Sequence, residues 1–182
     1  KIGKYVTSIG QSAFGGCQSL KQLTVPDTVK TIGANAFSGC VSMETLTLPA
    51  GLTEIPEGMC YYCSMLREVN IPDSVTSIGN EAFYQCGNLP TPELPGGLET
   101  IGDYAFAFCI SIDKAQLPSS VENLGSAVYC GCEAITEFTV PADMTDMGSL
   151  SFLGCKGMTQ YTVEAGNPVY SEQDGVLFNR SE

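Results

Sequence analysis

Apolar and polar residues alternate in short runs along this chain, and most runs end at a proline. In residues 20–26, Leu23 and Val25 alternate with polar neighbours before Pro26. An alternation with period two is typical of a strand with one buried face. Proline has no N–H to donate to a neighbouring strand, so it closes the run. The pattern predicts a short, half-buried strand.

The residues after the strand predict two further elements. Val29 and Ile32-Gly33 indicate a tight apolar turn, and residues 34–40 contain an Ala36-Phe37 pair. We interpret this pair as one helical turn that directs the aromatic ring inward. A βαβ crossover with a full helix needs about 30 residues, more than separate one strand from the next. Each unit is therefore predicted to be a strand, a corner, a helical turn and a second corner.

Four markers repeat this unit every 23 residues. The first marker is a cysteine, at Cys17, Cys40, Cys63, Cys86, Cys109, Cys132 and Cys155. The second is a proline, at Pro26, Pro49, Pro72, Pro95, Pro118 and Pro141. The third is Ile-Gly or its equivalent, at Ile9-Gly10, Ile32-Gly33, Ile78-Gly79, Ile101-Gly102, Leu124-Gly125 and Met147-Gly148, with Ile55-Pro56 as the departure. The fourth is an aromatic residue, at Phe14, Phe37, Phe83, Phe106, Tyr129 and Phe152, with Cys60 as the departure. Stacked copies bury their apolar faces against one another, so the repeat predicts a solenoid with a parallel sheet on one face.

The unit resembles the leucine-rich repeat, and within it the BspA-like class, whose pattern is L-x-x-L-x-L/V-P-x-x-L/V-x-x-I-G-x-x-A-F-x-x-C. Six units carry this pattern: Leu20–Cys40, Met43–Cys63, Leu66–Cys86, Leu89–Cys109, Ile112–Cys132 and Ile135–Cys155. Residues 167–178 also resemble the N-P-x-Y-x-x-x-D-G-V-L-F stretch that interrupts coils in that family. The sequence departs from the pattern at Pro56, Cys60, Pro90, Pro92 and Val163-Glu164. We expect these departures to make the third and fourth coils irregular without changing the fold.

The resemblance implies an α/β fold: a right-handed leucine-rich-repeat solenoid with a short-strand parallel sheet on the concave face and short helical turns on the convex face. We interpret residues 1–182 as a single domain, with 165–182 as a hairpin or capping segment that turns at Asp174-Gly175. The chain opens part-way through one unit and stops shortly after another pattern begins, so it is interpreted as a piece of a longer polypeptide. No stretch approaches the roughly 20 apolar residues that span a bilayer, so no membrane insertion of this segment is expected.

Charge and composition exclude several classes of function. Eight Lys and Arg against twenty Asp and Glu give a net charge of −12, and the chain contains no His. Nucleic-acid affinity depends on basic side chains, so DNA and RNA are poor partners for this chain. Without His there is no Ser–His or Cys–His nucleophile pair, no imidazole proton shuttle and no His-containing metal site.

The nine cysteines are interpreted mainly as core residues rather than as a disulfide framework. Seven of them occupy equivalent positions, so we expect a ladder of buried free thiols that donate weakly to neighbouring carbonyl groups. Cys60 replaces a buried ring and leaves a packing deficit for its neighbours to fill. Cys130 falls on an outward position and is predicted to be the most reactive thiol.

Metal and catalytic sites find little support in the sequence. A zinc site at Cys60 and Cys63 lacks the four ligands that structural zinc requires. Calcium at residues 143–146 or 172–174 lacks a dense run of oxygen ligands. Glu68 and Glu93 lie on neighbouring predicted strands and could reach a glycosidase-like separation, but nothing around them suggests a desolvating pocket. We expect no enzyme activity, no cofactor and no metal.

Two surfaces remain as candidates for binding a partner. Strand alternation places polar residues on the open face of the sheet, including Thr47, Glu68, Asn70, Glu93, Lys114, Gln116, Glu137 and Thr139. Threonine is also favoured there simply by its β propensity. The second candidate is a cluster of aromatic residues expected to point outward near the helical turns, at Tyr61, Tyr62, Tyr84 and Phe108. Clustered aromatics are typical of interaction hot spots, although these rings could instead pack flat against the coils or contact a second copy.

The resemblance to the BspA-like class implies a bacterial cell-surface or secreted protein that binds proteins of a host or of other bacteria. We therefore expect a non-enzymatic, monomeric adhesion module outside the cell. The alternative is a structural spacer that holds another domain away from the cell wall and has no ligand of its own.

Overall fold

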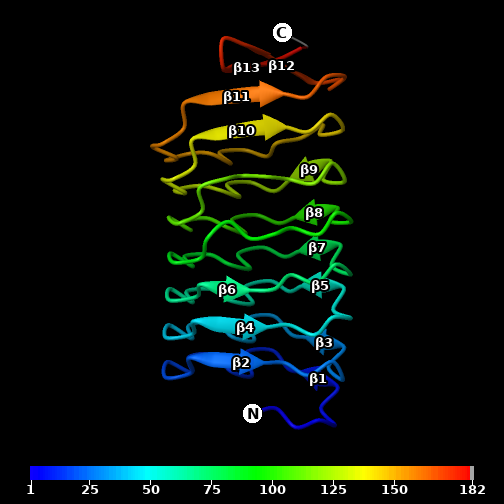
Figure 1. The fold of residues 1–182 in the computed structure, drawn as a ribbon, viewed down its shortest axis with the longest axis vertical. Coiled ribbons are helices and arrows are strands. Elements are labelled where there is room, and N and C mark those ends of the chain that lie inside the picture. Colours follow the sequence, from blue (N-terminus) through cyan, green and yellow to red (C-terminus); the bar gives the residue numbers. More distant parts are fainter. Residues whose placement is uncertain (181–182) are drawn as a thin grey trace.

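The computed structural model describes residues 1–180 as a stack of about seven coils, with the two ends of the chain at opposite ends of the stack (Figure 1). Neighbouring coils are joined by two separate rows of short parallel strands and by a row of turns. The apolar side chains of all three rows point into one continuous core. This architecture is a parallel β-solenoid of the leucine-rich-repeat type.

The first row of strands forms the predicted sheet, and we call its outer surface the sheet face. It contains β2 (Gln22–Thr24), β4 (Thr45–Thr47), β6 (Glu68–Val69), β10 (Glu137–Val140) and β11 (Gln160–Val163). Its register pairs residues one repeat apart, such as Leu23 with Leu46. Leu23 and Leu46 are buried whereas Thr24 and Thr47 are exposed, as the alternation predicts.

The second row of strands was not predicted, because its residues were interpreted as a tight turn. It contains β1 (Ser8–Ile9), β3 (Thr31–Ile32), β5 (Glu54–Ile55), β7 (Ser77–Ile78), β8 (Thr100–Ile101) and β9 (Asn123–Leu124). The N–H of Gly79 donates to the carbonyl of Ile55 one coil before it, at 2.8 Å. A Cβ at Gly79 would lie 2.5 Å from the Glu57 nitrogen. Glycine therefore marks this row because the preceding coil leaves no room for a side chain.

This second row is interrupted once, between β3 and β5. Pro56 occupies the glycine position of that coil and has no N–H. It cannot donate to the Ile32 carbonyl in the way that Gly79 donates to Ile55. The departure seen in the sequence thus has a local structural effect and leaves the stack intact.

The predicted helical turns are wrong, since residues 1–180 contain no helix. Residues such as 34–40 instead form consecutive tight turns, and we call the surface they make the turn face. The N–H groups of Phe37 and Gly39 donate to carbonyls of the next coil, at 3.0 and 2.7 Å, while that of Ser38 donates to Asn35 at 3.1 Å. Asn35 and Gly39 have positive φ angles of 57° and 70°. These left-handed residues reverse the peptide direction and turn alternate N–H groups toward the neighbouring coil, so a helical ladder cannot form.

The repeating aromatic and cysteine residues form two parallel columns inside the stack. Phe83 and Phe106 are stacked 5.4 Å apart, and Tyr129 continues the column at 5.6 Å from Phe106. Six repeating cysteines are buried free thiols whose Sγ groups donate to carbonyls of the preceding coil, as predicted: Cys40, Cys63, Cys86, Cys109, Cys132 and Cys155. The prediction is wrong for Cys17, which is exposed in the first described coil.

The described part of the chain ends in an antiparallel hairpin of β12 (Tyr170–Gln173) and β13 (Val176–Asn179). Its turn residues Asp174 and Gly175 have φ angles of 54° and 78°, as a two-residue hairpin turn of the primed type requires. The Gly175 carbonyl accepts the N–H of Tyr161, at 2.9 Å. The hairpin is thereby attached to the last strand of the sheet.

Candidate functional site

The four aromatic residues singled out in the sequence form one ring cluster across three successive coils. The Tyr61 and Tyr84 rings are stacked, with centroids 5.0 Å apart and planes 9° apart. Tyr62 lies 4.8 Å from Tyr61, and Phe108 contacts the Tyr84 ring edge-on at 5.5 Å. Tyr62 and Phe108 are 41% and 39% exposed. We call these four residues the aromatic patch, because their rings support one another and remain accessible on the turn face.

Two patch residues hold a backbone conformation that favours glycine. The residue before the repeating cysteine has a positive φ in every coil, and it is glycine at Gly16, Gly39, Gly131 and Gly154. The same position is occupied by Tyr62 and Phe108, each with a φ of 60°, and by Gln85 with 56°. A left-handed conformation costs a residue with a Cβ about 1–2 kcal/mol. Tyr62 and Phe108 therefore hold their rings where the backbone alone favours glycine.

The charge around the aromatic patch is acidic. The patch lies on the turn segments 57–65, 80–88 and 103–111. These three segments contain no lysine or arginine, and their charged residues are Glu57, Glu81 and Asp103. Burial raises the pKa of Tyr61 and Tyr84, and the nearby Glu81 carboxylate adds to the rise in both. Glu81 is thus part of the electrostatic surroundings of the rings, a role that its isolated position in the sequence did not signal.

Other apolar side chains extend the accessible surface around the patch. Tyr104, Ile110, Leu150 and Leu153 are all exposed on the turn face or at its edge. Cys130 shares the row of Tyr61 and Tyr84 and is half-buried, and burial raises its pKa. Cys17 in the first described coil is exposed as well, and the higher reactivity of Cys130 stays a prediction.

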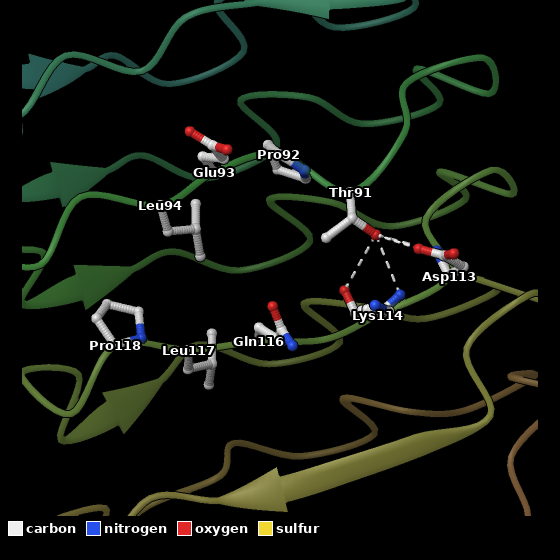
Figure 2. Close-up of a pocket in the computed structure, with 9 residues that line it drawn as sticks. All are labelled: Thr91, Pro92, Glu93, Leu94, Asp113, Lys114, Gln116, Leu117 and Pro118. Carbon is white, nitrogen blue, oxygen red and sulfur yellow. Dashed lines mark hydrogen bonds between the residues drawn. The ribbon is translucent and has the colours of Figure 1, made fainter.

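The sheet face is disrupted where the sequence places Pro90 and Pro92. Pro90 has no N–H for the Arg67 carbonyl, so no strand forms at residues 90–94. Figure 2 shows that, toward the following coil, the Thr91 hydroxyl makes the contacts: it donates to the Asp113 carboxylate at 2.7 Å and accepts the Lys114 N–H at 3.1 Å. A side chain thus replaces the backbone ladder between this coil and the following one, while the gap at the Arg67 carbonyl is not filled by it.

Shallow depressions accompany this break in the sheet. One of about 590 Å³ is lined by Thr91, Glu93, Lys114 and Gln116, among others. A second, of about 440 Å³, is lined by Glu68, Asn70 and Glu93. A third, of about 400 Å³, includes Lys114, Gln116, Glu137 and Thr139. The structure therefore brings seven of the eight sheet-face candidates into three adjoining hollows, and Thr47 lies outside them.

Several sheet-face candidates are already engaged in bonds between coils. The Asn70 side chain accepts the Leu48 N–H at 2.7 Å and donates to the Leu48 carbonyl at 3.1 Å. Glu137 accepts a bond from Gln160 at 3.0 Å, and the Thr139 hydroxyl lies 2.8 Å from that of Thr162. These polar groups tie neighbouring coils together, so fewer of them are free for a partner.

Neither the carboxylates nor the cysteines assemble a reactive centre. Glu68 and Glu93 line one shallow hollow, and both side chains are exposed to solvent. Cys60 and Cys63 are both buried. In residues 1–180, no group of three or more Cys, Asp or Glu side chains is placed to hold a metal ion. No helix in that part of the chain is long and apolar enough to cross a membrane.

The repeat can now be compared with known families. Residues 1–89 and 53–173 match the family model described as "BspA type Leucine rich repeat region (6 copies)". The chain belongs to the BspA-type leucine-rich repeat family. The irregular coil at Pro90 and Pro92 falls inside the matched residues, so it is a variation within this family. Among curated proteins, no sequence matches the chain significantly.

Solved structures of bacterial leucine-rich-repeat proteins share the fold. A leucine-rich cell surface protein of Faecalibacterium prausnitzii is 31% identical over 98% of this chain and 48% of its own, with a TM-score of 0.87. The leucine-rich repeat protein of T. pallidum is 26% identical over 87% of this chain and 64% of its own, with a TM-score of 0.62. A Eubacterium ventriosum protein is 29% identical over 69% of this chain and 34% of its own, with a TM-score of 0.63. The BspA-type chain described here thus spans less than two thirds of each of these relatives.

Proposed function

We propose that the chain is a non-enzymatic protein-binding module of a bacterial cell-surface or secreted protein, and that a protein partner docks on the aromatic patch. The observation that carries this proposal is the accessible, mutually supported ring cluster on three successive coils. Aromatic residues are enriched at the centres of protein interfaces, where they contribute much of the binding energy. A rigid repeat scaffold holds such rings in place and lowers the entropic cost of binding.

The proposed location follows from the relatives. One of them is a leucine-rich cell surface protein, and it covers nearly the whole of this chain. A binding module held at the surface of a bacterium would attach it to host proteins or to other bacteria, so adhesion is the role proposed for it. The sheet face then serves mainly to join the coils, since several of its side chains bond to one another.

The proposal is tested by comparing two sets of substitutions in the intact domain. The patch variant changes Tyr61, Tyr62, Tyr84 and Phe108 to Ser, and the matched sheet-face variant carries Thr47→Ser, Glu137→Gln and Thr139→Ser. Each immobilised protein is exposed to a panel of purified extracellular-matrix proteins and to whole bacterial cells. We expect the patch variant to lose capture, the sheet-face variant to keep it, and thermal melting to show both variants folded.

Two outcomes would contradict the proposal. Capture that survives in the patch variant but fails in the sheet-face variant would move the binding site to the sheet face. A folded wild-type domain that captures nothing on the whole panel would favour the alternative, a structural spacer without a ligand.

A further inference from the structure

The rings of the aromatic patch are not all parallel: Tyr61 and Tyr84 are stacked with planes 9° apart, whereas Tyr62 and Phe108 are tilted against them. Tyr62 is inclined by 58° to Tyr61 and by 53° to Tyr84, and Phe108 stands at 76° to Tyr84. An aromatic face carries negative potential and attracts a cation placed over it. Several non-parallel rings around one point strengthen this attraction, as in sites that hold ammonium groups.

The acidic side chains near the rings favour a cation, as the ring faces do. Glu81 lies on the same turn as Tyr84, because the Tyr84 N–H donates to the Glu81 carbonyl at 3.1 Å. The Glu81 carboxylate also acts on the phenols of Tyr61 and Tyr84. Glu57 and Asp103 are exposed on the adjacent coils, and the three turn segments carry no basic side chain to neutralise these acids.

The backbone of the repeat and the neighbouring coil hold two of the rings in place. Tyr62 and Phe108 keep left-handed conformations at a position that four other coils give to glycine. The Phe108 ring covers Gly131 of the next coil, where an added Cβ would lie 2.5 Å from the ring. Gln85 shares this conformation on the intervening coil, so it is a feature of the repeat that fixes where the two rings lie.

From these observations we propose that the segment of a protein partner seated on the aromatic patch is cationic, with an arginine or lysine side chain lying over the rings beside Glu81. This inference rests on the proposed function and defines the chemistry of its partner. An anionic segment would meet charges of its own sign, and a neutral apolar segment would cover Glu81 without giving it a partner. Arginine fits best, because its planar guanidinium group stacks on a ring and bonds a carboxylate at the same time.

The inference is tested with four synthetic peptides of equal length, in which glycine alternates with arginine, lysine, glutamine or glutamate. Each is titrated into the intact domain by calorimetry, and the tyrosine ring signals are followed by NMR. We expect the arginine peptide to bind tightest, the lysine peptide next, and the neutral and acidic peptides at least about tenfold more weakly. High salt is expected to weaken the binding of the arginine peptide.

Variants then connect binding to the named residues. Glu81→Gln removes one charge at constant size and is expected to weaken arginine-peptide binding about threefold or more. The double variant Tyr62→Gly, Phe108→Gly removes two rings and introduces the residue that other coils carry at this position. It should therefore fold, and its affinity for the arginine peptide should be about tenfold lower. Gln85→Gly changes the same position on the intervening coil without removing a ring, but it also removes the side chain that hydrogen-bonds Tyr84; it should therefore lose less affinity than the double glycine variant.

Three results would overturn the inference. The first is equal affinity for the arginine and glutamine peptides, and the second is undiminished affinity of the folded double glycine variant for the arginine peptide. The third is that a neutral oligosaccharide displaces the arginine peptide as well as an unlabelled arginine peptide does. The capture experiment uses no peptide, so the two proposals can fail separately. If capture depends on the patch but the domain shows no preference for basic peptides, the inference of a cationic partner is wrong and the proposed function is retained.

Discussion

At the scale of single residues, the third coil shows how the core adapts to a departure from the repeat. Cys60 occupies the position of the inward ring, yet it is fully buried. The residue before it is Met59, also fully buried, where other coils have alanine, as at Ala36 and Ala82. A long side chain beside a short one thus replaces the Ala-Phe pair and occupies the same interior.

This exchange predicts a non-additive pair of substitutions. Cys60→Phe alone adds a ring beside Met59 and should lower the free energy of unfolding by about 1–3 kcal/mol. Combined with Met59→Ala it restores the Ala-Phe pair of other coils, and most of that loss should be recovered. Urea unfolding of the two single variants and the double variant measures the coupling. Additive losses would show that the two side chains do not share one space.

The buried thiols predict a loss of stability at alkaline pH. Burial raises the pKa of Cys109 from 9.0 to about 12. Above about pH 9 the unfolded chain releases this proton while the folded chain retains it, so stability is fully present below pH 9 and falls as pH rises toward 12. In Cys109→Ala, the free energy of unfolding measured with urea should fall less steeply with pH across this range, with a slope smaller by up to about 1.4 kcal/mol per pH unit. A slope identical to that of the wild type would contradict the assignment.

Residue patterns predicted much of the core and of the candidate surfaces, but not how the backbone runs around them. Spacing predicted seven buried cysteines, of which six are buried, and brought the four aromatics onto adjacent coils. The turn segments were interpreted as helical, because an Ala-Phe pair is compatible with a helix and left-handed residues such as Glu81 or Tyr104 carry no signature of their own. The importance of Glu81 likewise appears only when neighbouring coils are stacked.

At the scale of elements, the rows of strands depend on close contact between backbones. The second row was missed because each strand has only two residues, too few to show an alternation. Its repeated glycine was visible in the sequence, but a turn explains glycine as well as a close approach does. Only the stacked coils show that the glycine lacks room for a side chain.

Gly79→Ala tests this requirement. The new methyl group would lie 2.5 Å from the Glu57 nitrogen, so the strands must separate and the free energy of unfolding should fall by about 2 kcal/mol or more. Gly97→Ala is the control, because no atom lies within 4 Å of its added Cβ; a change within about 1 kcal/mol is expected there. Equal effects in chemical denaturation would contradict the close-contact explanation.

Where Pro90 and Pro92 interrupt the sheet, the Thr91 hydroxyl is predicted to stabilise the contact with the following coil. In Thr91→Val, the Asp113 and Lys114 N–H groups lose their acceptor, and the free energy of unfolding should fall by about 1–2 kcal/mol. Amide exchange at these two residues should accelerate. Thr24→Val, an exposed change on the same face, should alter stability by no more than about 0.5 kcal/mol. Unchanged exchange in Thr91→Val would show that the hydroxyl is dispensable.

At the scale of the whole molecule, the two faces of the solenoid differ in what their side chains contact. The sheet face uses its polar side chains to bond coil to coil, and its hollows are shallow and open. The turn face carries rings that the stack does not need for backbone geometry, beside carboxylates on turn segments that contain no lysine or arginine. The division follows from the repeat, because each coil contributes one position to every column and a few changed positions create a surface without altering the fold.

Hydrogen–deuterium exchange of the domain with and without the arginine peptide tests this division most directly. Slower exchange is expected in the turn segments 57–65, 80–88 and 103–111, with β4, β6 and β10 unchanged. Protection confined to those strands, with the turn segments unaffected, would contradict the assignment of recognition to the turn face.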